Sequence, residues 1–131
     1  MVGIVIVSHS QKLAESIAEY TALMAGEAHV APAGGTDEGG FGTSFQKIYD
    51  AVEKVDSEDG VLVLMDMGSA VMTAEMVLEA YGSDRVEMVD CPIVEGAVVA
   101  TIMPRRDSPG RTSRRPFPRW HPHPSSENQI Q

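Results

Sequence analysis

Apolar residues in this chain form two kinds of pattern, short continuous runs and longer stripes at helical spacing. Residues 2–7 are apolar and largely β-branched without alternation, which is typical of a strand covered on both faces in a parallel sheet. After a polar break at residues 8–10, apolar positions recur at helical spacing (Leu13, Ile17, Tyr20 and Met24). We expect a strand, a short loop and a helix, with Ser8 and Gln11 forming a capping box.

The same unit recurs along the chain. Residues 29–33 form a weaker strand, and the glycine-rich loop after it precedes a second apolar stripe (Phe45, Ile48, Val52 and Val55). Residues 60–65 form the clearest strand, closed by Asp66 and followed by a helix that ends at Gly82. Residues 85–89 and 93–100 supply a fourth strand and helix.

Four successive strand–helix units predict an α/β fold, a parallel sheet with helices on both faces. In the flavodoxin-like strand order 2-1-3-4, the first and third strands are neighbours, and ligands bind at their carboxyl ends. His9 and Asp66 follow those two strands and would therefore meet at that edge. The strand order is assumed from the fold class.

Composition changes abruptly after Met103. Residues 1–103 contain four Lys or Arg against 17 Asp or Glu, a net charge of −13, whereas residues 104–131 contain six Arg against two acidic residues, a net charge of +4. We predict one folded domain over residues 1–103 and an Arg/Pro-rich disordered tail over residues 104–131. A reading-frame shift in a GC-rich gene is one hypothesis for this tail, which resequencing or intact-mass analysis would test.

Charge and cysteine content exclude several classes of function. An acidic domain repels nucleic acid and anionic membranes but attracts a protein with a basic face. Cys91 is the single cysteine, so an internal disulfide is excluded, and no zinc-site spacing can be assembled. The first apolar run is too short for a membrane span and lacks the basic start of a signal peptide. We therefore predict a cytoplasmic protein without a metal.

His9 is the leading candidate for chemistry, although a lone histidine is more often structural. It lies at a strand-to-helix junction, where backbone N–H groups and the helix dipole favour an anion by about 0.3–1 kcal/mol. Asp66 could orient one ring nitrogen of His9 and leave the other to attack phosphorus. Equally, Asp66 could simply cap the next helix.

Four further residues are candidate phosphoryl contacts: Ser10, Thr36, Gly68 and Ser69. Gly68 offers a backbone N–H and Ser69 a hydroxyl, although a Gly-Ser pair can also merely begin a helix. Thr36 and also Thr43 are candidate phosphate or partner contacts in the loop GGTDEGGFGTS, which could equally be a mobile connection without a role. This loop lacks the Lys of a P-loop, so direct binding of ATP is not expected.

Four segments together resemble the DhaM family, whose domain is similar to the mannose-type IIA domain of the sugar phosphotransferase system. They are GIVIVSHSQKLAE (3–15), GGTDEGGFGTS (34–44), VLVLMDMGSAVMTAE (61–75) and CPIVEGAVVA (91–100). The resemblance covers nearly all of residues 1–103. Beyond VEGAVVA the family would continue with more helix, where this chain has its Arg/Pro-rich end.

The resemblance implies a relay in which His9 accepts phosphate that originates in phosphoenolpyruvate and arrives through enzyme I and the carrier HPr. His9 then passes it to ADP held by the DhaL subunit, and the regenerated ATP phosphorylates dihydroxyacetone (glycerone) on DhaK. The likeness also implies that Asp66 orients His9, that Thr36, Gly68 and Ser69 lie near the phosphoryl group, and that the chain is a homodimer. No cofactor would be bound directly.

Alternative functions stay open at this point. The string MDMGSA favours the kinase relay, because mannose-type transporter domains more often carry a DLxGGSP-like sequence there. One alternative is a IIA component that passes phosphate to a IIB domain for sugar uptake, and another is a non-catalytic regulatory domain that responds to phosphorylation. A flavodoxin-like fold with an unrelated ligand would leave VSHS and MDMGSA unexplained. The phosphorylated ring nitrogen of His9 is also undetermined.

Overall fold

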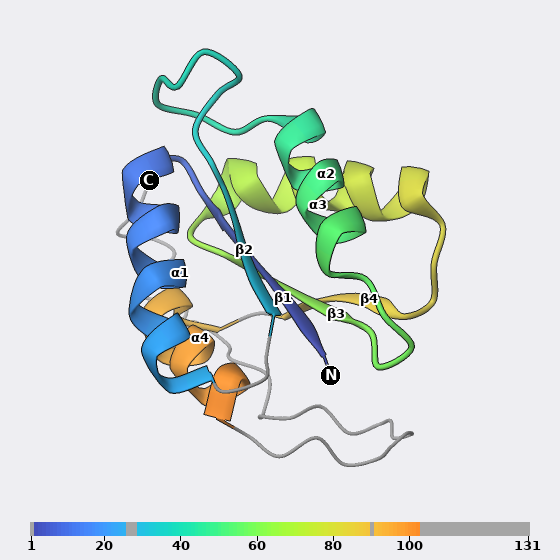
Figure 1. Ribbon diagram of the computed structural model, residues 1–131. Coiled ribbons are helices and arrows are strands. Elements are labelled where there is room, and N and C mark those ends of the chain that lie inside the picture. Colours follow the sequence, from blue (N-terminus) through green and yellow to red (C-terminus); the bar gives the residue numbers. More distant parts are fainter. Residues whose placement is uncertain (1, 26–28, 90, 103–131) are drawn as a thin grey trace, which may run out of the picture.

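Four strands and four helices alternate along the chain. The computed structural model describes residues 2–25, 29–89 and 91–102. The elements are β1 (Gly3–Ser8), α1 (Gln11–Ala25), β2 (His29–Gly34), α2 (Phe45–Val55), β3 (Val61–Met65), α3 (Gly68–Tyr81), β4 (Val86–Val89) and α4 (Ile93–Ile102). All strand pairs are parallel, in the order β2-β1-β3-β4 (Figure 1). The predicted α/β fold and its 2-1-3-4 strand order are confirmed.

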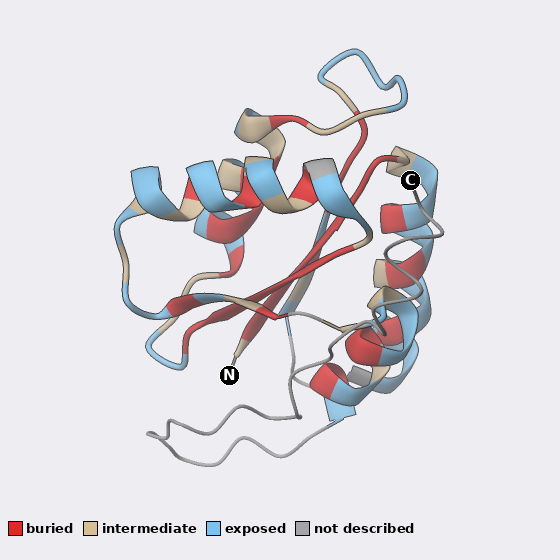
Figure 2. Cartoon of the chain, turned by 180° about the vertical axis from the view of Figure 1, so that it is seen from behind, coloured by how far each residue is buried: buried red, intermediate tan, exposed pale blue. Residues whose placement is uncertain are grey.

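Helices cover both faces of the sheet, which explains the continuous apolar runs of β1 and β3. Successive side chains of a strand point to opposite faces. Val5 and Val7 therefore pack in one buried cluster, with residues of α2 and α3, while Ile4 and Ile6 pack in another, with residues of α1 and α4. Figure 2 shows the buried positions on the strands and on parts of the helices. Each fully buried Val or Ile side chain contributes roughly 1.5–3 kcal/mol.

The predicted capping box of Ser8 and Gln11 at the start of α1 is wrong. Ser10 is the residue that caps this helix, because its Oγ accepts a hydrogen bond from Leu13 N at 3.1 Å. Ser8 still belongs to β1, and its Oγ accepts from Ser10 N at 3.0 Å. The strand extends further than the apolar run, so the helix cap lies two residues later.

The predicted boundary after residue 103 and the predicted tail over residues 104–131 lie outside the described residues. Both stay predictions.

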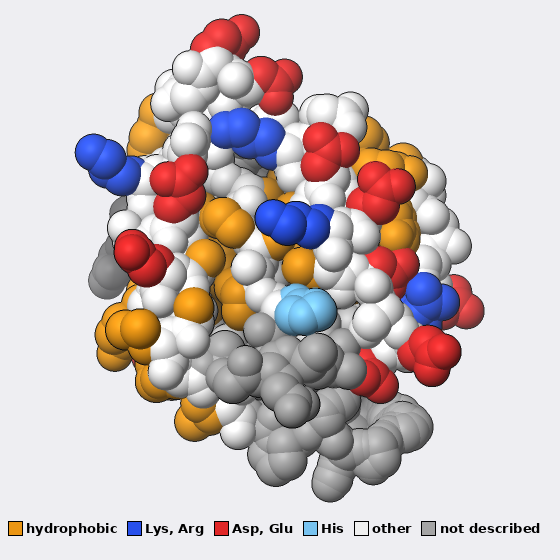
Figure 3. Space-filling view, viewed as in Figure 1, with side chains coloured by type: hydrophobic (Ala, Val, Ile, Leu, Met, Phe, Trp, Pro, Cys, Tyr) orange, Lys and Arg blue, Asp and Glu red, His pale blue; other side chains and the backbone are white. Residues whose placement is uncertain are grey.

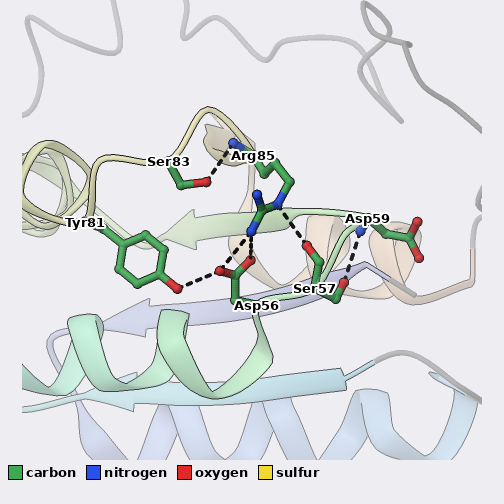
Figure 4. Close-up of polar contacts among 6 residues, drawn as sticks. All are labelled: Asp56, Ser57, Asp59, Tyr81, Ser83 and Arg85. Atoms are coloured by element: carbon green, nitrogen blue, oxygen red, sulfur yellow. Dashed lines mark hydrogen bonds and ion pairs between the residues drawn. The ribbon is translucent and has the colours of Figure 1, made fainter.

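Asp56 connects three elements at the amino end of the sheet, opposite the predicted site (Figure 4). Its Oδ2 accepts a hydrogen bond from Tyr81 Oη at 2.6 Å, and Arg85 Nη2 lies 3.2 Å from both carboxylate oxygens. Arg85 Nε also donates to Ser57 O at 3.1 Å. These contacts join the ends of α2 and α3 to the residue that precedes β4.

These contacts move two pKa values in opposite directions. The hydrogen bond from Tyr81, with a further contribution from Arg85, holds the pKa of Asp56 below 3.8 despite partial burial. In turn the Asp56 carboxylate raises the pKa of Tyr81 from 10.0 to about 12. Both pKa shifts favour an ionised Asp56 carboxylate that accepts from a neutral Tyr81 hydroxyl. The cluster therefore stabilises the fold at pH values between the pKa of Asp56 and the pKa of Tyr81.

Replacing Asp56 by Asn removes the charge and nearly preserves the side-chain size. A hydrogen bond to a charged group contributes roughly 1.5–3 kcal/mol, and Asn can still accept weakly from Tyr81. We therefore expect Asp56→Asn to lower the free energy of unfolding by roughly 1–2 kcal/mol near neutral pH. Because the folded pKa of Asp56 is depressed, this contribution is present above about pH 4 and is lost as the pH falls through the folded pKa.

Urea unfolding of the wild type and Asp56→Asn over a series of pH values measures this effect. The stability difference between the two proteins should shrink in acid. A difference that is the same at every pH would contradict the assignment.

Candidate active site at the carboxyl ends of β1 and β3

The sheet places the segments after β1 and β3 side by side. In the parallel register Val7 lies opposite Met65, and Asp66 N continues the ladder by donating to Val7 O at 3.1 Å. His9 and Asp66 therefore come into contact although they are distant in sequence, as the assumed strand order requires. Their chemical roles stay predictions.

The Asp66 carboxylate contacts three groups of Ser8, the last residue of β1, and of His9, which follows it. Its Oδ2 accepts hydrogen bonds from Ser8 Oγ at 2.9 Å and from His9 N at 3.1 Å. Its Oδ1 lies 3.1 Å from His9 Nδ1, and the two side chains are only 16% and 10% exposed. The N-cap of α3 is Met67, without a side-chain capping bond. The alternative in which Asp66 only caps α3 therefore does not describe this site.

The contact between Asp66 and His9 selects one form of the imidazole ring. A carboxylate can only accept hydrogen bonds, so its contact with Nδ1 requires the hydrogen to lie on Nδ1. In the neutral ring the lone pair is then on Nε2. The arrangement uses the same physical principle as other histidines that are oriented by a carboxylate.

The remaining predicted residues have mainly local roles in the structure. Ser10 caps α1, and Thr36 Oγ1 accepts from Gly40 N at 2.9 Å, which folds the loop between β2 and α2 back on itself. Gly68 is the exposed first residue of α3, whereas the side chain of Ser69 is not among those described. Thr43 Oγ1 lies 3.0 Å from Thr73 Oγ1 and so connects the loop to α3. Contact of these predicted residues with a phosphoryl group stays a prediction.

Three residues of the site were not predicted: Ser8, Phe41 and Lys47. Ser8 orients the carboxylate of Asp66, and a polar residue at the end of an apolar strand was the available sequence signal. The ring of Phe41 lies 5.6 Å from that of His9 between centroids, tilted by 33°. An aromatic residue inside a polar, glycine-rich loop was the corresponding signal, and this loop projects beyond the sheet in Figure 1.

Lys47 connects three elements near the start of α1. Its Nζ donates to Gln11 Oε1 at 3.1 Å and to Gly34 O at 2.9 Å, so α2 is linked to the start of α1 and the end of β2. A shallow groove of about 390 Å³ lies between α1, which contributes Gln11, and the loop between β2 and α2. The groove is lined by Ser10, Gln11, Lys12, Glu15, Gly39, Gly40 and Phe41.

No helix within the described ranges is long and apolar enough to cross a membrane. In the same ranges, no group of three or more His, Cys, Asp or Glu side chains is arranged to hold a metal ion.

Comparison with known proteins identifies the family. The family model EIIA-man, described as the fructose IIA component of the phosphotransferase system, matches residues 3–108. Phosphoryl donor subunit DhaM of the PEP-dependent dihydroxyacetone kinase 2 of Listeria innocua is 36% identical over 106 residues, which cover 78% of this chain and 85% of that protein. The DhaM of Escherichia coli is 40% identical over 109 residues, but this chain spans only 23% of its length.

Solved structures agree with the fold. A crystal structure of a protein described as of unknown function superimposes with a TM-score of 0.71 at 33% identity, over 78% of this chain and 81% of that one. A sigma-54 interaction domain protein from Enterococcus faecalis has a TM-score of 0.57 at 20% identity and supports the fold alone. The family model matches most of the chain, and the chain covers 85% and 83% of two DhaM proteins of Listeria innocua; it therefore belongs to the EIIA-man family and is a relative of the DhaM proteins.

Proposed function

We propose that this chain carries a phosphoryl group on His9 and donates it within a PEP-dependent dihydroxyacetone kinase. The observation that carries the proposal is the contact between His9 Nδ1 and Asp66 Oδ1 at the carboxyl ends of β1 and β3. The names of the DhaM relatives supply the reaction. In finer detail, HPr, loaded from phosphoenolpyruvate through enzyme I, is the donor, and ADP held by DhaL is the acceptor. The resulting ATP phosphorylates dihydroxyacetone on DhaK.

The proposed chemistry consists of two transfers at one nitrogen. In the first, the lone pair of His9 Nε2 attacks phosphorus, a P–N bond forms, and the bond between phosphorus and the donor breaks. The ring becomes cationic, and the negative charge of Asp66 stabilises it through the Nδ1 hydrogen. In the second, a terminal phosphate oxygen of ADP attacks phosphorus, and the electron pair of the P–N bond returns to Nε2.

The backbone around His9 favours a bound anion. α1 begins at Gln11, two residues after His9, and α3 begins at Gly68, two residues after Asp66. Both helices therefore direct their amino ends toward the same edge of the sheet. Each such terminus favours a negative group by about 0.3–1 kcal/mol, which supports a phosphoryl group at this position.

The surface charge supports basic protein partners. The described residues include four Lys or Arg against 15 Asp or Glu. Figure 3 shows acidic side chains spread over one face, with fewer basic ones among them. Complementary charge accelerates the encounter of such a surface with a basic one. The homodimer and the cytoplasmic location implied earlier stay predictions.

Replacing His9 by Ala should abolish phosphorylation, because it removes the nitrogen that attacks phosphorus in the proposed reaction. The measurement incubates the protein with phosphoenolpyruvate, enzyme I and HPr and maps acid-labile phosphate by mass spectrometry. His29→Ala is the matched control, since His29 is an exposed histidine at the start of β2, away from the site. Phosphate that is still incorporated in His9→Ala would end the proposal.

Asp66→Asn should slow phosphoryl transfer by at least about 100-fold, with the fold retained. The amide nitrogen of Asn would donate to Nδ1, so the hydrogen of the neutral ring would move to Nε2 and block the nucleophile. Transfer rates from HPr measure the loss, and ¹⁵N NMR of the imidazole reports the change of tautomer. Asp56→Asn makes the same chemical change at the other end of the sheet and should leave transfer unchanged. Equal rates in wild type and Asp66→Asn would refute the orienting role.

The molecule that accepts the phosphoryl group from His9 distinguishes the kinase relay from sugar uptake and from a regulatory role. The phosphorylated protein is offered ADP-loaded DhaL in one reaction and a IIB domain in another. Formation of ATP supports the kinase relay, transfer to the IIB domain would indicate sugar uptake, and retention of phosphate in both would favour a regulatory domain.

A further inference from the structure

The reactive ring proposed above is almost completely covered, and an exposed phenyl ring lies against it. His9 is only 8% exposed, whereas Phe41 is 76% exposed. The two rings are 5.6 Å apart between centroids. Phe41 is therefore the outer member of the pair, with one side toward His9 and the other toward solvent.

The backbone holds Phe41 in this position from both sides. Gly42 N donates to His9 O at 2.8 Å, which ties the residue after Phe41 to His9 itself. On the other side, Thr36 and Gly40 form a compact turn through Thr36 N to Gly40 O at 3.0 Å and Gly40 N to Thr36 Oγ1 at 2.9 Å. Gly42 has φ 146°, a conformation that glycine adopts readily. In a larger residue at this position, the Cβ atom would lie only 2.8 Å from Thr36 Cγ2.

A phosphohistidine at this position requires protection from water. Hydrolysis and productive transfer use the same electrophile, because either water or the acceptor oxygen can attack phosphorus. Exclusion of water from a site prevents such loss of a reactive intermediate. A phenyl ring has no hydrogen-bonding group with which to hold or orient an attacking water molecule.

We propose that Phe41 shields the phosphoryl group on His9 from water and moves aside when the acceptor docks. The inference rests on the proposed function. In the side reaction that Phe41 suppresses, a water oxygen attacks phosphorus and the P–Nε2 bond breaks. Its electron pair returns to Nε2, and the water protons remain with inorganic phosphate and the solvent.

The groove beside α1 gives the ring a place to move. Phe41 lines this groove, together with Gly39 and Gly40 of the loop and with Gln11 and Lys12 of α1. Phe41 is flanked by Gly40 and Gly42, and loop motions that open and close a site commonly use such positions. In the proposed motion, the ring of Phe41 rotates along the groove and uncovers His9, while Gly42 N stays bonded to the carbonyl oxygen of His9.

The test follows the lifetime of phosphohistidine without an acceptor. Wild type, Phe41→Ala, Phe41→Leu and Leu23→Ala are loaded through HPr, separated from the donors and monitored for release of inorganic phosphate. Phe41→Ala should release phosphate about 2- to 10-fold faster, the factor that corresponds to loss of one aromatic contact. Phe41→Leu should restore most of the lifetime. Leu23→Ala removes another exposed apolar side chain, 83% exposed on α1, and should match the wild type.

Other outcomes of this experiment distinguish a failure of the proposed shield from a failure of the proposed function. An unchanged lifetime in Phe41→Ala overturns the shield, and slower loading from HPr in that variant would make Phe41 a docking contact instead. Failure of Phe41→Ala alone to load also overturns the proposal, because a shield is not required for loading. If the wild type takes up no phosphate from HPr or from phosphoramidate, the proposed function fails, and the inference with it. Thermal unfolding of each variant confirms that the fold is intact.

Discussion

The carboxylate of Asp66 is the group on which the geometry of the site depends. It accepts hydrogen bonds from Ser8 and from the backbone of His9 while its other oxygen contacts the imidazole. One negative charge therefore sets the direction of the chain after β1 and the tautomer of His9. These contacts form because β1 and β3 are neighbours in the sheet, so the active geometry is a consequence of strand order.

The two ends of the sheet differ in construction. At the amino end, Asp56, Tyr81 and Arg85 join three elements through direct side-chain bonds. At the carboxyl end, a glycine-rich loop is bonded to His9 through Gly42 N, and the exposed ring of Phe41 lies beside the imidazole. Direct side-chain bonds therefore join elements at the amino end of the sheet, whereas the glycine-rich loop contributes an exposed ring at the carboxyl end.

The elements and the leading residues could be predicted from the sequence because their signals are local. Apolar runs and helical stripes identify four strand–helix units, and His9 and Asp66 stand directly after the strands that form the clearest runs. Ser8 and Phe41 were not found in this way, because periodicity does not show which residue of a distant segment a side chain contacts. The helix cap was misplaced because β1 includes Ser8, so that Ser10 is the first residue able to cap α1.

The sequence by itself determined the number, type and order of the elements, since periodicity reflects which side chains a strand or helix buries. It also determined which chemical groups stand at strand ends. The tertiary structure alone decided that β1 lies beside β3, that the Asp66 carboxylate turns toward His9 rather than capping α3, and that the ring of Phe41 lies beside the imidazole. Such contacts join distant segments, and their geometry follows from packing and hydrogen bonding of the whole sheet rather than from any local pattern.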